Sequence, residues 1–320
     1  MKLFITGGLG FIGSNFIRYI LNKYPGASIV NFDKQTYASC KVNLKDLQGS
    51  KRYRFVKGDI CDKIAVKNAM SGCRAVINFA AESHVDRSIE DPVIFLKTNI
   101  IGVEVLLNVA KSLKIKKFIQ ISTDEVYGSR LRGSFKEGDI LEPNSPYSAS
   151  KAAADLIVRA YSKTYNFNAM ITRSSNNFGP FQFPEKVIPL FITNLLENKK
   201  VPLYGDGLNV RDWIYVLDNC AGIDLALRRG KAGEIYNIGA GNEINNKQLT
   251  GVILKMLGKS DKYIKYVKDR LGHDRRYSIN TAKIRKLGFK LETSFSEAIL
   301  YTVNWYKGHE SWWQKLKKRS

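Results

Sequence analysis

The stretch TGGLGFIGS, Thr6–Ser14, decides the fold of this chain. It follows the apolar run KLFIT and opens a segment with the apolar spacing of an amphipathic helix. Gly8, Gly10 and Gly13 fit the pattern GxGxxG, while Gly7, Gly10 and Gly13 fit GxxGxxG. Such glycines permit a tight turn, a close approach of backbone to a pyrophosphate and close packing of helix on strand. The stretch therefore predicts a strand, turn and helix that bind a dinucleotide.

An acidic residue supports this interpretation and indicates which dinucleotide is bound. Asp33 directly follows the second apolar run, SIVNF, and lies twenty residues beyond Gly13. A carboxylate there can hydrogen-bond both ribose hydroxyls and would repel a 2′-phosphate, which favours NAD over NADP. The alternative is an ordinary strand-to-helix turn followed by a chance Asp. Motif, strand context and spacing together favour NAD as the cofactor.

Apolar runs of strand length recur along the chain, with helix-length amphipathic segments between them: KLFIT, SIVNF, YRFVKG, AVINFA, KFIQIST and NAMITRSS. This alternation predicts repeated βαβ units with right-handed crossovers, hence an α/β fold with a doubly wound parallel sheet of the Rossmann type. After about Gly179 the pattern loosens into pieces punctuated by Pro and Gly. We expect an NAD-binding Rossmann domain over residues 1–178, with a returning segment near 212–240, and a smaller C-terminal lobe over 179–320 that mainly binds substrate.

Composition fits a soluble globular protein. The chain has 320 residues and 36.2 kDa, with 44% apolar and 25% charged residues, and no apolar run reaches the ~18 residues of a membrane span. MKLFITGG has none of the features of a signal peptide, so we expect a cytoplasmic protein without membrane contact. The four cysteines lack CxxC spacing and there are three histidines, so we expect reduced cysteines and no metal site.

The chain is strongly basic, with a net charge of +22 and a pI near 9.7. Clustered Lys and Arg would indicate a polyanion such as nucleic acid. Here the positive residues are spread widely, and only the tail KLKKRS and the surroundings of IKKF are locally dense. We interpret the charge as a solvated basic surface that also attracts anionic substrates, rather than as a nucleic-acid site.

Two further stretches carry the chemistry, QISTDEVYG (residues 120–128) and PYSASK (residues 146–151). The first ends a predicted parallel strand, and the carboxyl ends of such strands face the ligand crevice, so Thr123, Asp124 and Glu125 are expected there. Tyr147 and Lys151 are four residues apart and share one face of a helix. A Lys near a Tyr hydroxyl lowers the phenol pKa, so phenolate can take a proton from an alcohol while hydride leaves. This predicts dehydrogenase chemistry.

A series of motifs carries a resemblance to a known family: TGGLGFIGS, DKQTYA, GDICD, FAAESHVDRSI, STDEVYG, YSASK, SSNNFGP, FPEKVIPL, YGDGLNVRDWIYV, YNIGAGNE and DRLGHDRRY. Over nearly its whole length the chain resembles the extended short-chain dehydrogenases/reductases, specifically the nucleoside-diphosphate-glucose 4,6-dehydratases. The resemblance implies an NAD-dependent lyase that converts UDP-glucose or dTDP-glucose to the 4-keto-6-deoxy sugar, with NAD tightly bound and regenerated in each turnover.

The resemblance also gives the acids a role. After oxidation at C4, Glu125 would take the C5 proton while protonated Asp124 gives a proton to the departing C6 hydroxyl, and hydride then returns to C6. Thr123 would hydrogen-bond the C4 oxygen, and Tyr147, assisted by Lys151, would be the base for its proton. Two adjacent carboxyl groups in a partly desolvated cleft are expected to have separated pKa values.

The resemblance implies two sets of binding residues. The expected NAD contacts are Gly7, Gly10, Phe11, Ile12, Gly13, Asp33, Lys34, Thr36, Asp59, Ile60, Ala80, Ala81, Ser83, Thr98, Tyr147, Lys151 and Asn177. The expected substrate contacts are Ser83, His84, Thr123, Asn176, Lys186, Val187, Tyr204, Arg211, Asn246, Arg270 and His273. The chemistry agrees, because Arg forks suit phosphate oxygens and a Tyr can stack on a pyrimidine.

Several alternatives stay open. The nearest rival is a nucleotide-sugar 4-epimerase, which needs the Tyr, the Lys and the hydroxyl but no acid–base pair at C5 and C6. A rival of another class is a Rossmann protein that senses NAD, which would tend to lose Tyr147 or Lys151. The nucleotide is undecided between UDP and dTDP, with a slight lean to UDP-glucose, and rhamnose is one end product. By resemblance we expect a homodimer through the helix that carries Tyr147, with an isologous interface.

Overall fold

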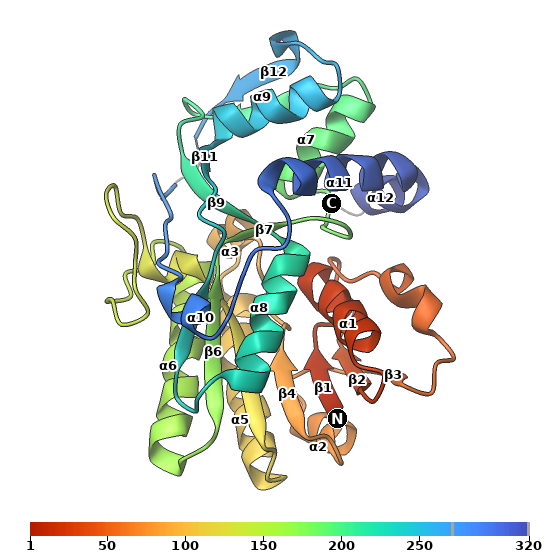
Figure 1. The fold of residues 1–320 in the computed structure, drawn as a ribbon, viewed down its shortest axis with the longest axis vertical. Helices are drawn as coiled ribbons and strands as arrows, with labels where there is room; N and C mark the ends of the chain where they lie inside the picture. Colours follow the sequence, from red (N-terminus) through yellow and green to blue (C-terminus); the bar gives the residue numbers. More distant parts are fainter. Residues whose placement is uncertain (270–271, 319–320) are drawn as a thin grey trace.

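The computed structural model describes residues 1–269 and 272–318. Its main sheet has seven parallel strands in the order β10-β6-β5-β4-β1-β2-β3 (Figure 1). These strands are β1 (Lys2–Thr6), β2 (Ser28–Asp33), β3 (Tyr53–Lys57), β4 (Ala75–Asn78), β5 (Lys117–Thr123), β6 (Ala169–Ser174) and β10 (Ile235–Ile238). The predicted doubly wound α/β class is confirmed.

Both faces of the sheet are covered because successive side chains of each strand point to opposite sides. Leu3 and Ile5 of β1 belong to the core on one side, and Phe4 belongs to the core on the other. The first side is covered by α1 (Phe11–Lys23) and α8 (Val216–Arg229), and the second by α2 (Lys63–Met70), α5 (Gly102–Ser112) and α6 (Pro146–Tyr165) (Figure 1).

The chain also contains several short helical elements. They are η1 (Lys41–Leu47), α3 (Val85–Glu90), α4 (Val93–Leu96), the π turn η2 (Lys97–Ile101), η3 (Asp124–Tyr127) and α10 (Ala282–Lys286). Among the described residues, one helical stretch, 93–112, is long and apolar enough to cross a membrane, with a mean hydropathy of 1.7. Half of it is buried inside the protein, which is typical of a core helix in a soluble protein.

A smaller lobe lies beyond the carboxyl ends of the main strands (Figure 1). One sheet holds β7 (Asn176–Phe178), β9 (Val210–Tyr215) and β11 (Glu243–Asn245), and another pairs β8 (Val201–Tyr204) with β12 (Ile264–Val267). Its helical elements are α7 (Val187–Leu196), α9 (Asn246–Met256), η4 (Asp261–Tyr263), α11 (Phe295–Gly308) and α12 (Glu310–Lys317). Between the lobes the chain returns to the main sheet as β10, which pairs with β6.

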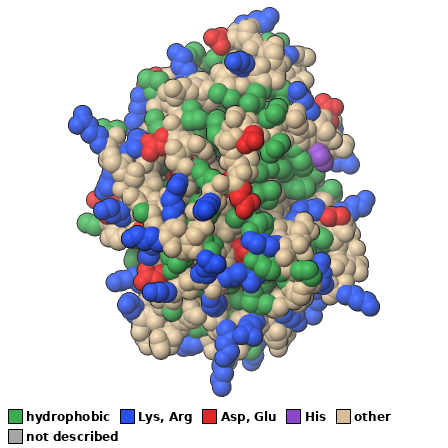
Figure 2. Space-filling model, in the orientation of Figure 1, with side chains coloured by type: hydrophobic (Ala, Val, Ile, Leu, Met, Phe, Trp, Pro, Cys, Tyr) green, Lys and Arg blue, Asp and Glu red, His purple; other side chains and the backbone are tan. Residues whose placement is uncertain are grey.

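Basic side chains lie all over the face of the molecule shown in Figure 2, interspersed with acidic and apolar ones. Several basic residues are paired with acids, as in the exposed Arg275–Asp206 pair at 2.9 Å. On this face the Lys and Arg side chains do not gather into a single stripe, the arrangement that would follow a nucleic-acid backbone.

Candidate active site

A cleft runs along the carboxyl ends of the main strands and reaches the smaller lobe. All of the expected NAD contacts line this cleft. Five further residues that we expect to bind substrate or to act in catalysis line it too. Those five are Thr123, Asp124, Glu125, Asn176 and Lys186. Sequence positions more than 150 residues apart thus meet in one crevice, at the place where an open α/β sheet binds its ligands.

The glycine-rich turn at the start of the cleft requires its glycines. Gly7 has φ +66°, and a Cβ there would lie 2.6 Å from the backbone nitrogen of Ala80. A Cβ on Gly13 would lie 2.5 Å from the carbonyl oxygen of Gly7. No side chain caps the N-terminus of α1 at Gly10, so its first amide groups are open to an anion from the cleft. The turn fits a pyrophosphate.

Asp33 lies buried at the end of β2 and is held in a fixed orientation. Its carboxylate accepts hydrogen bonds from the backbone N–H of Leu9 at 3.0 Å and of Gln35 at 2.7 Å, and from the hydroxyl of Ser39 at 2.9 Å. Burial raises the pKa of Asp33, and these three bonds oppose that rise. Beside it, Lys34 pairs with Asp59 at 2.8 Å. The carboxylate is placed where a ribose hydroxyl can reach it.

The end of β5 places an acid in a dry environment. The Thr123 hydroxyl donates to Asp124 Oδ1 at 3.3 Å and accepts from the N–H of Glu125 at 3.2 Å. Asp124 is 3% exposed, and its Oδ2 has no hydrogen-bond partner in the described protein. Burial raises the pKa of Asp124 well above its usual range, and the charges of Glu125 and Asp212 raise it further. The acid form of Asp124 is therefore favoured.

Tyr147 and Lys151 lie in the first two turns of α6. A capping box between Ser145 and Ser148 fixes the first turn. Lys151 Nζ donates to the carbonyl oxygen of Ile121 at 2.6 Å. Burial lowers the pKa of Lys151 to about 8, against the charge of Asp155, which raises it. The net pKa of Tyr147 is raised in this structure, so the expected net lowering is wrong. Burial raises the pKa of Tyr147, and the charge of Glu125 raises it further; Asp124 adds to this only when it is ionised.

A polar cluster at the mouth of the cleft includes a residue that sequence reasoning missed. Glu185 Oε2 lies 3.7 Å from Nε2 of His84 and 3.8 Å from Arg87, while Glu185 Oε1 accepts from the Tyr37 hydroxyl at 3.2 Å. Arg87 lies over the Tyr37 ring, 3.6 Å from its centroid. His84 is itself outside the cleft lining, and burial lowers its pKa. The motif FPEK, residues 183–186, contains Glu185, but only its Lys is assigned a role from the sequence.

Those of the remaining expected substrate contacts that the structure describes lie in the smaller lobe, outside the lining of the cleft. Arg211 is buried against the ring of Tyr277, 4.1 Å from its centroid, and donates to the carbonyl oxygens of Val210 at 2.7 Å and Asp274 at 2.9 Å. Tyr204 and His273 lie edge to face, with ring centroids 6.4 Å apart. The others are Val187 and Asn246, which begin α7 and α9, and Arg270, which falls outside the described residues.

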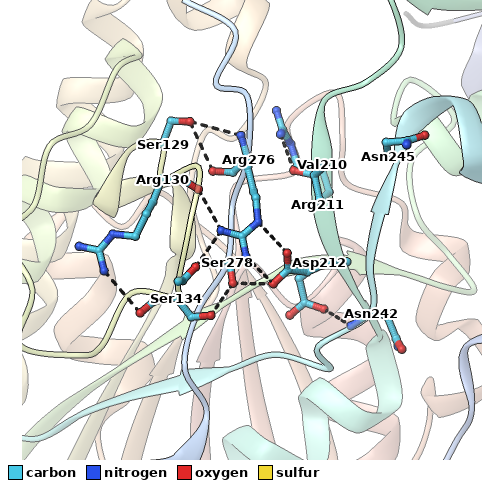
Figure 3. A network of polar contacts seen from close by, with 12 residues as sticks. Ser129, Arg130, Ser134, Val210, Arg211, Asp212, Asn242, Asn245, Arg276 and Ser278 are labelled. Carbon is cyan, nitrogen blue, oxygen red and sulfur yellow. Dashed lines mark hydrogen bonds and ion pairs between the residues drawn. The ribbon is translucent and has the colours of Figure 1, made fainter.

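A polar network joins the loop after the catalytic segment to the smaller lobe (Figure 3). Arg276 makes two bonds to the carboxylate of Glu243, at 2.7 and 3.0 Å, and donates to the carbonyl oxygens of Arg130 at 3.0 Å and Gly133 at 2.7 Å. The Ser129 hydroxyl accepts from the backbone N–H of Arg276 at 3.2 Å. This network fixes the smaller lobe against the loop that follows Glu125.

Comparison with known proteins agrees with this geometry. The family model described as GDP-mannose 4,6 dehydratase matches residues 4–302. The chain belongs to that family. A dTDP-glucose 4,6-dehydratase from Streptomyces antibioticus is 46% identical over 325 residues, covering 100% of this chain and 96% of that protein. The solved dTDP-glucose 4,6-dehydratase DesIV from Streptomyces venezuelae, with NAD bound, has a TM-score of 0.97 and 48% identity, covering 99% of this chain and 100% of that one.

The family assignment confirms the predicted enzyme class and cofactor: the chain is an NAD-dependent nucleotide-sugar 4,6-dehydratase, a hydro-lyase. Members of the wider fold run other reactions. A UDP-glucose 4-epimerase from Thermotoga maritima has a TM-score of 0.90 at 29% identity, over 96% of this chain and 99% of that one. Fold alone therefore does not separate dehydratase from epimerase, and the side chains at the end of β5 must do so.

Proposed function

We propose that this dehydratase converts dTDP-glucose to dTDP-4-keto-6-deoxyglucose. The observation that carries the proposal is the position of Thr123, Asp124 and Glu125 beside Tyr147 and Lys151 in one cleft. The names of the relatives support dTDP over UDP as the nucleotide, against our slight lean to UDP-glucose from the sequence. The product would supply deoxysugar synthesis, of which rhamnose is one example.

The residues around the glycine-rich turn fit NAD. Gly7 and Gly13 leave no room for a Cβ, and Asn177 has a side-chain oxygen that is buried in the cleft lining without a partner in the described protein. We assign the cofactor contacts named from the sequence to this site, within a Rossmann domain of residues 1–178 and its returning segment near 212–240. When bound, NAD supplies the acceptor for a hydride from C4 and its return to C6.

In the oxidation half, Tyr147 takes the proton of the C4 hydroxyl while Thr123 hydrogen-bonds the C4 oxygen. Burial and two neighbouring carboxyl groups disfavour phenolate in the structure, so a nearby positive charge must offset them. Lys151 is the cationic side chain one helical turn away, and its ammonium group persists below about pH 8. Its role is to make the Tyr147 phenolate accessible at neutral pH.

In the elimination half, the two acids act in opposite senses. The ketone at C4 acidifies the C5 hydrogen, which Glu125 removes as base. Asp124, whose acid form burial favours, gives its proton to the departing C6 hydroxyl, which leaves as water. When hydride returns to C6, Glu125 returns its proton to C5. An epimerase would have no use for this pair, so it is the feature that favours a dehydratase site.

The nucleotide part of the substrate would occupy the smaller lobe, residues 179–320. Lys186 reaches the cleft and donates to the carbonyl oxygen of Ser83 at 3.1 Å. Positive side chains there suit a diphosphate, and the exposed ring of Tyr204 can stack on a pyrimidine. The proposed contacts are Ser83, His84, Asn176, Lys186, Val187, Tyr204, Arg211, Asn246, Arg270 and His273.

We also propose a cytoplasmic homodimer. Exposed apolar side chains occur on α4, η2 and α6, elements that contact one another: Val93, Ile94, Leu96, Ile101 and Leu156. An apolar surface of this kind is costly in water and suits a second copy of the same helices, in an isologous contact. The proposal agrees with the helix that carries Tyr147 serving as the dimer element.

The test is mass spectrometry of the purified protein incubated with dTDP-glucose or UDP-glucose. Loss of one water from the sugar of dTDP-glucose, without added NAD, would support the proposal. Glu125→Gln should abolish it, and Glu90→Gln, in an exposed residue outside the cleft lining, serves as the matched control that retains water loss. An unchanged mass with conversion to the galactose epimer would overturn the proposal. Reaction with UDP-glucose alone would overturn the choice of nucleotide.

A further inference from the structure

The C-terminal helices α11 and α12 belong to the smaller lobe and lie above α1 in the view of Figure 1. They reach the glycine-rich turn through a buried polar contact. The indole N–H of Trp312 in α12 donates to Asn43 Oδ1 at 2.9 Å, across 269 positions of sequence. The side-chain amide of Asn43 in turn donates to the carbonyl oxygen of Leu9 at 3.0 Å. Trp312 is 8% exposed and Asn43 is 1% exposed, so water does not compete for these bonds.

Leu9 is a central residue of the turn, between Gly8 and Gly10. Its carbonyl oxygen accepts from Asn43 and also from the backbone N–H of Cys40 at 3.1 Å, while its own N–H donates to Asp33 Oδ2 at 3.0 Å. One chain of hydrogen bonds therefore joins α12 to the carboxylate of Asp33, which the proposed function assigns to the ribose.

The same helices also contact a second part of the cleft lining, at Gln182. The Tyr306 hydroxyl donates to the carbonyl oxygen of Gln182, a residue of the cleft lining. Phe181, next to it, has φ +67° and packs against Trp305 and Trp312, with ring centroids 4.8 and 6.1 Å away. A non-glycine residue in this conformation needs its surroundings to hold it. The aromatic cluster supplies that restraint.

We propose that Trp312, acting through Asn43, is a positioning residue for NAD. It fixes the Leu9 peptide and Asp33 before the cofactor arrives, so binding does not have to order the turn. The proposal rests on the placement of NAD in this cleft under the proposed function. Trp312 acts on retention of the cofactor and not on the chemical steps, because its indole lies on the far side of Asn43 from Leu9 and Asp33.

Two variants break different links of the chain, and a third is a matched control. Trp312→Phe keeps an aromatic ring but removes the donor to Asn43. Asn43→Asp keeps the acceptor for Trp312 but removes the donor to Leu9. Trp305→Phe makes the same type of change in the same aromatic cluster, and none of the hydrogen bonds of the described residues joins its indole to Asn43.

The experiment measures how fast the purified holoenzyme loses NAD on dilution, and how dehydration depends on added NAD. We expect Trp312→Phe and Asn43→Asp each to weaken NAD retention by about tenfold. Saturating NAD should restore the wild-type kcat. The double variant should lose NAD no faster than the single variant that loses it faster. Trp305→Phe should retain NAD like wild type.

Wild-type NAD retention in Trp312→Phe would overturn the proposal, as would a reduced kcat at saturating NAD with unchanged NAD affinity. Equal loss of NAD in Trp305→Phe would also overturn it, since that result indicates general packing. Thermal unfolding of each variant with NAD present checks that it is folded. If Trp312→Phe is not folded, the NAD retention of Asn43→Asp decides the question. Failure of the proposed function would give a different result. The wild-type protein would then not dehydrate dTDP-glucose, however well it retains NAD.

Discussion

The hydroxyl of Thr123 lies 3.3 Å from Oδ1 of Asp124, and both groups are buried at the end of β5. This contact uses one oxygen of the carboxyl group and leaves Oδ2 without a partner in the described protein. A carboxyl group in that setting is a proton donor, since burial and the charge of Glu125 oppose its ionisation. In the mechanism we propose, the relationship links the oxidation half of the reaction, to which Thr123 is assigned, to the elimination half, to which Asp124 is assigned.

Replacing Asp124 with Asn should separate these halves. The amide keeps the shape of the side chain but has no acidic proton, so we expect water loss to slow by about 10²- to 10⁴-fold. Oxidation at C4 should proceed, so reduced cofactor should accumulate on the enzyme and be visible by its absorbance. In the wild-type enzyme, water loss should fall as pH rises through the raised pKa of Asp124, because the acid form is then lost. Equal slowing of both halves would contradict this assignment.

Lys151 should set an alkaline limit on the oxidation half. Its pKa is lowered to about 8 by burial, so the ammonium group is present below that pH and is lost above it. We expect the rate of cofactor reduction in a single turnover to decline above about pH 8. Lys151→Arg keeps its charge at all these pH values and should remove the decline, even if its rate is lower. A decline near pH 8 that persists in Lys151→Arg would assign it to another group.

The sequence was informative where function is carried by short local motifs. The glycine-rich turn, Asp33 and the segment from Thr123 to Glu125 all stand at strand ends, so hydrophobic periodicity was enough to predict that they share one crevice. The parallel sheet followed from the same alternation.

Contacts between distant segments could not be predicted in this way. Glu185 meets Tyr37 across 148 positions, and Trp312 meets Asn43 across 269. No periodicity indicates such pairs. The pKa of Tyr147 was mispredicted for a related reason: its sign depends on burial and on two carboxyl groups, and neither burial nor the Lys151 contact to Ile121 can be derived from a four-residue spacing.

A buried ion pair behind the active site should be important for stability. Arg173 Nε lies 2.8 Å from Asp155 Oδ2, and the guanidinium is 4.7 Å from the centroid of the Tyr127 ring. Arg173→Met would leave Asp155 buried without its guanidinium partner, which should lower the free energy of unfolding by about 3–5 kcal/mol. Urea unfolding with NAD held constant measures the change.

Two further variants test that explanation. Combining Arg173→Met with Asp155→Leu removes both charges and should recover part of the lost stability. Arg275→Met breaks the exposed pair with Asp206, where water screens the charges, and should leave the free energy of unfolding nearly unchanged. If the double variant were less stable than Arg173→Met, packing rather than the unpaired charge would explain the loss.

The apolar surface on α4, η2 and α6 should form the dimer contact. Leu156 of α6 is 56% exposed in the single chain and Val93 of α4 is 66% exposed. Leu156→Glu places a charge in this surface, and burying it against a second copy would be costly, so we expect a monomer by light scattering at concentrations where the wild type is a dimer. Ile64→Glu is the control, because Ile64 is equally apolar and 74% exposed but lies on α2, outside that surface. It should leave the dimer intact. A dimer that survives Leu156→Glu and dissociates with Ile64→Glu would move the interface to α2.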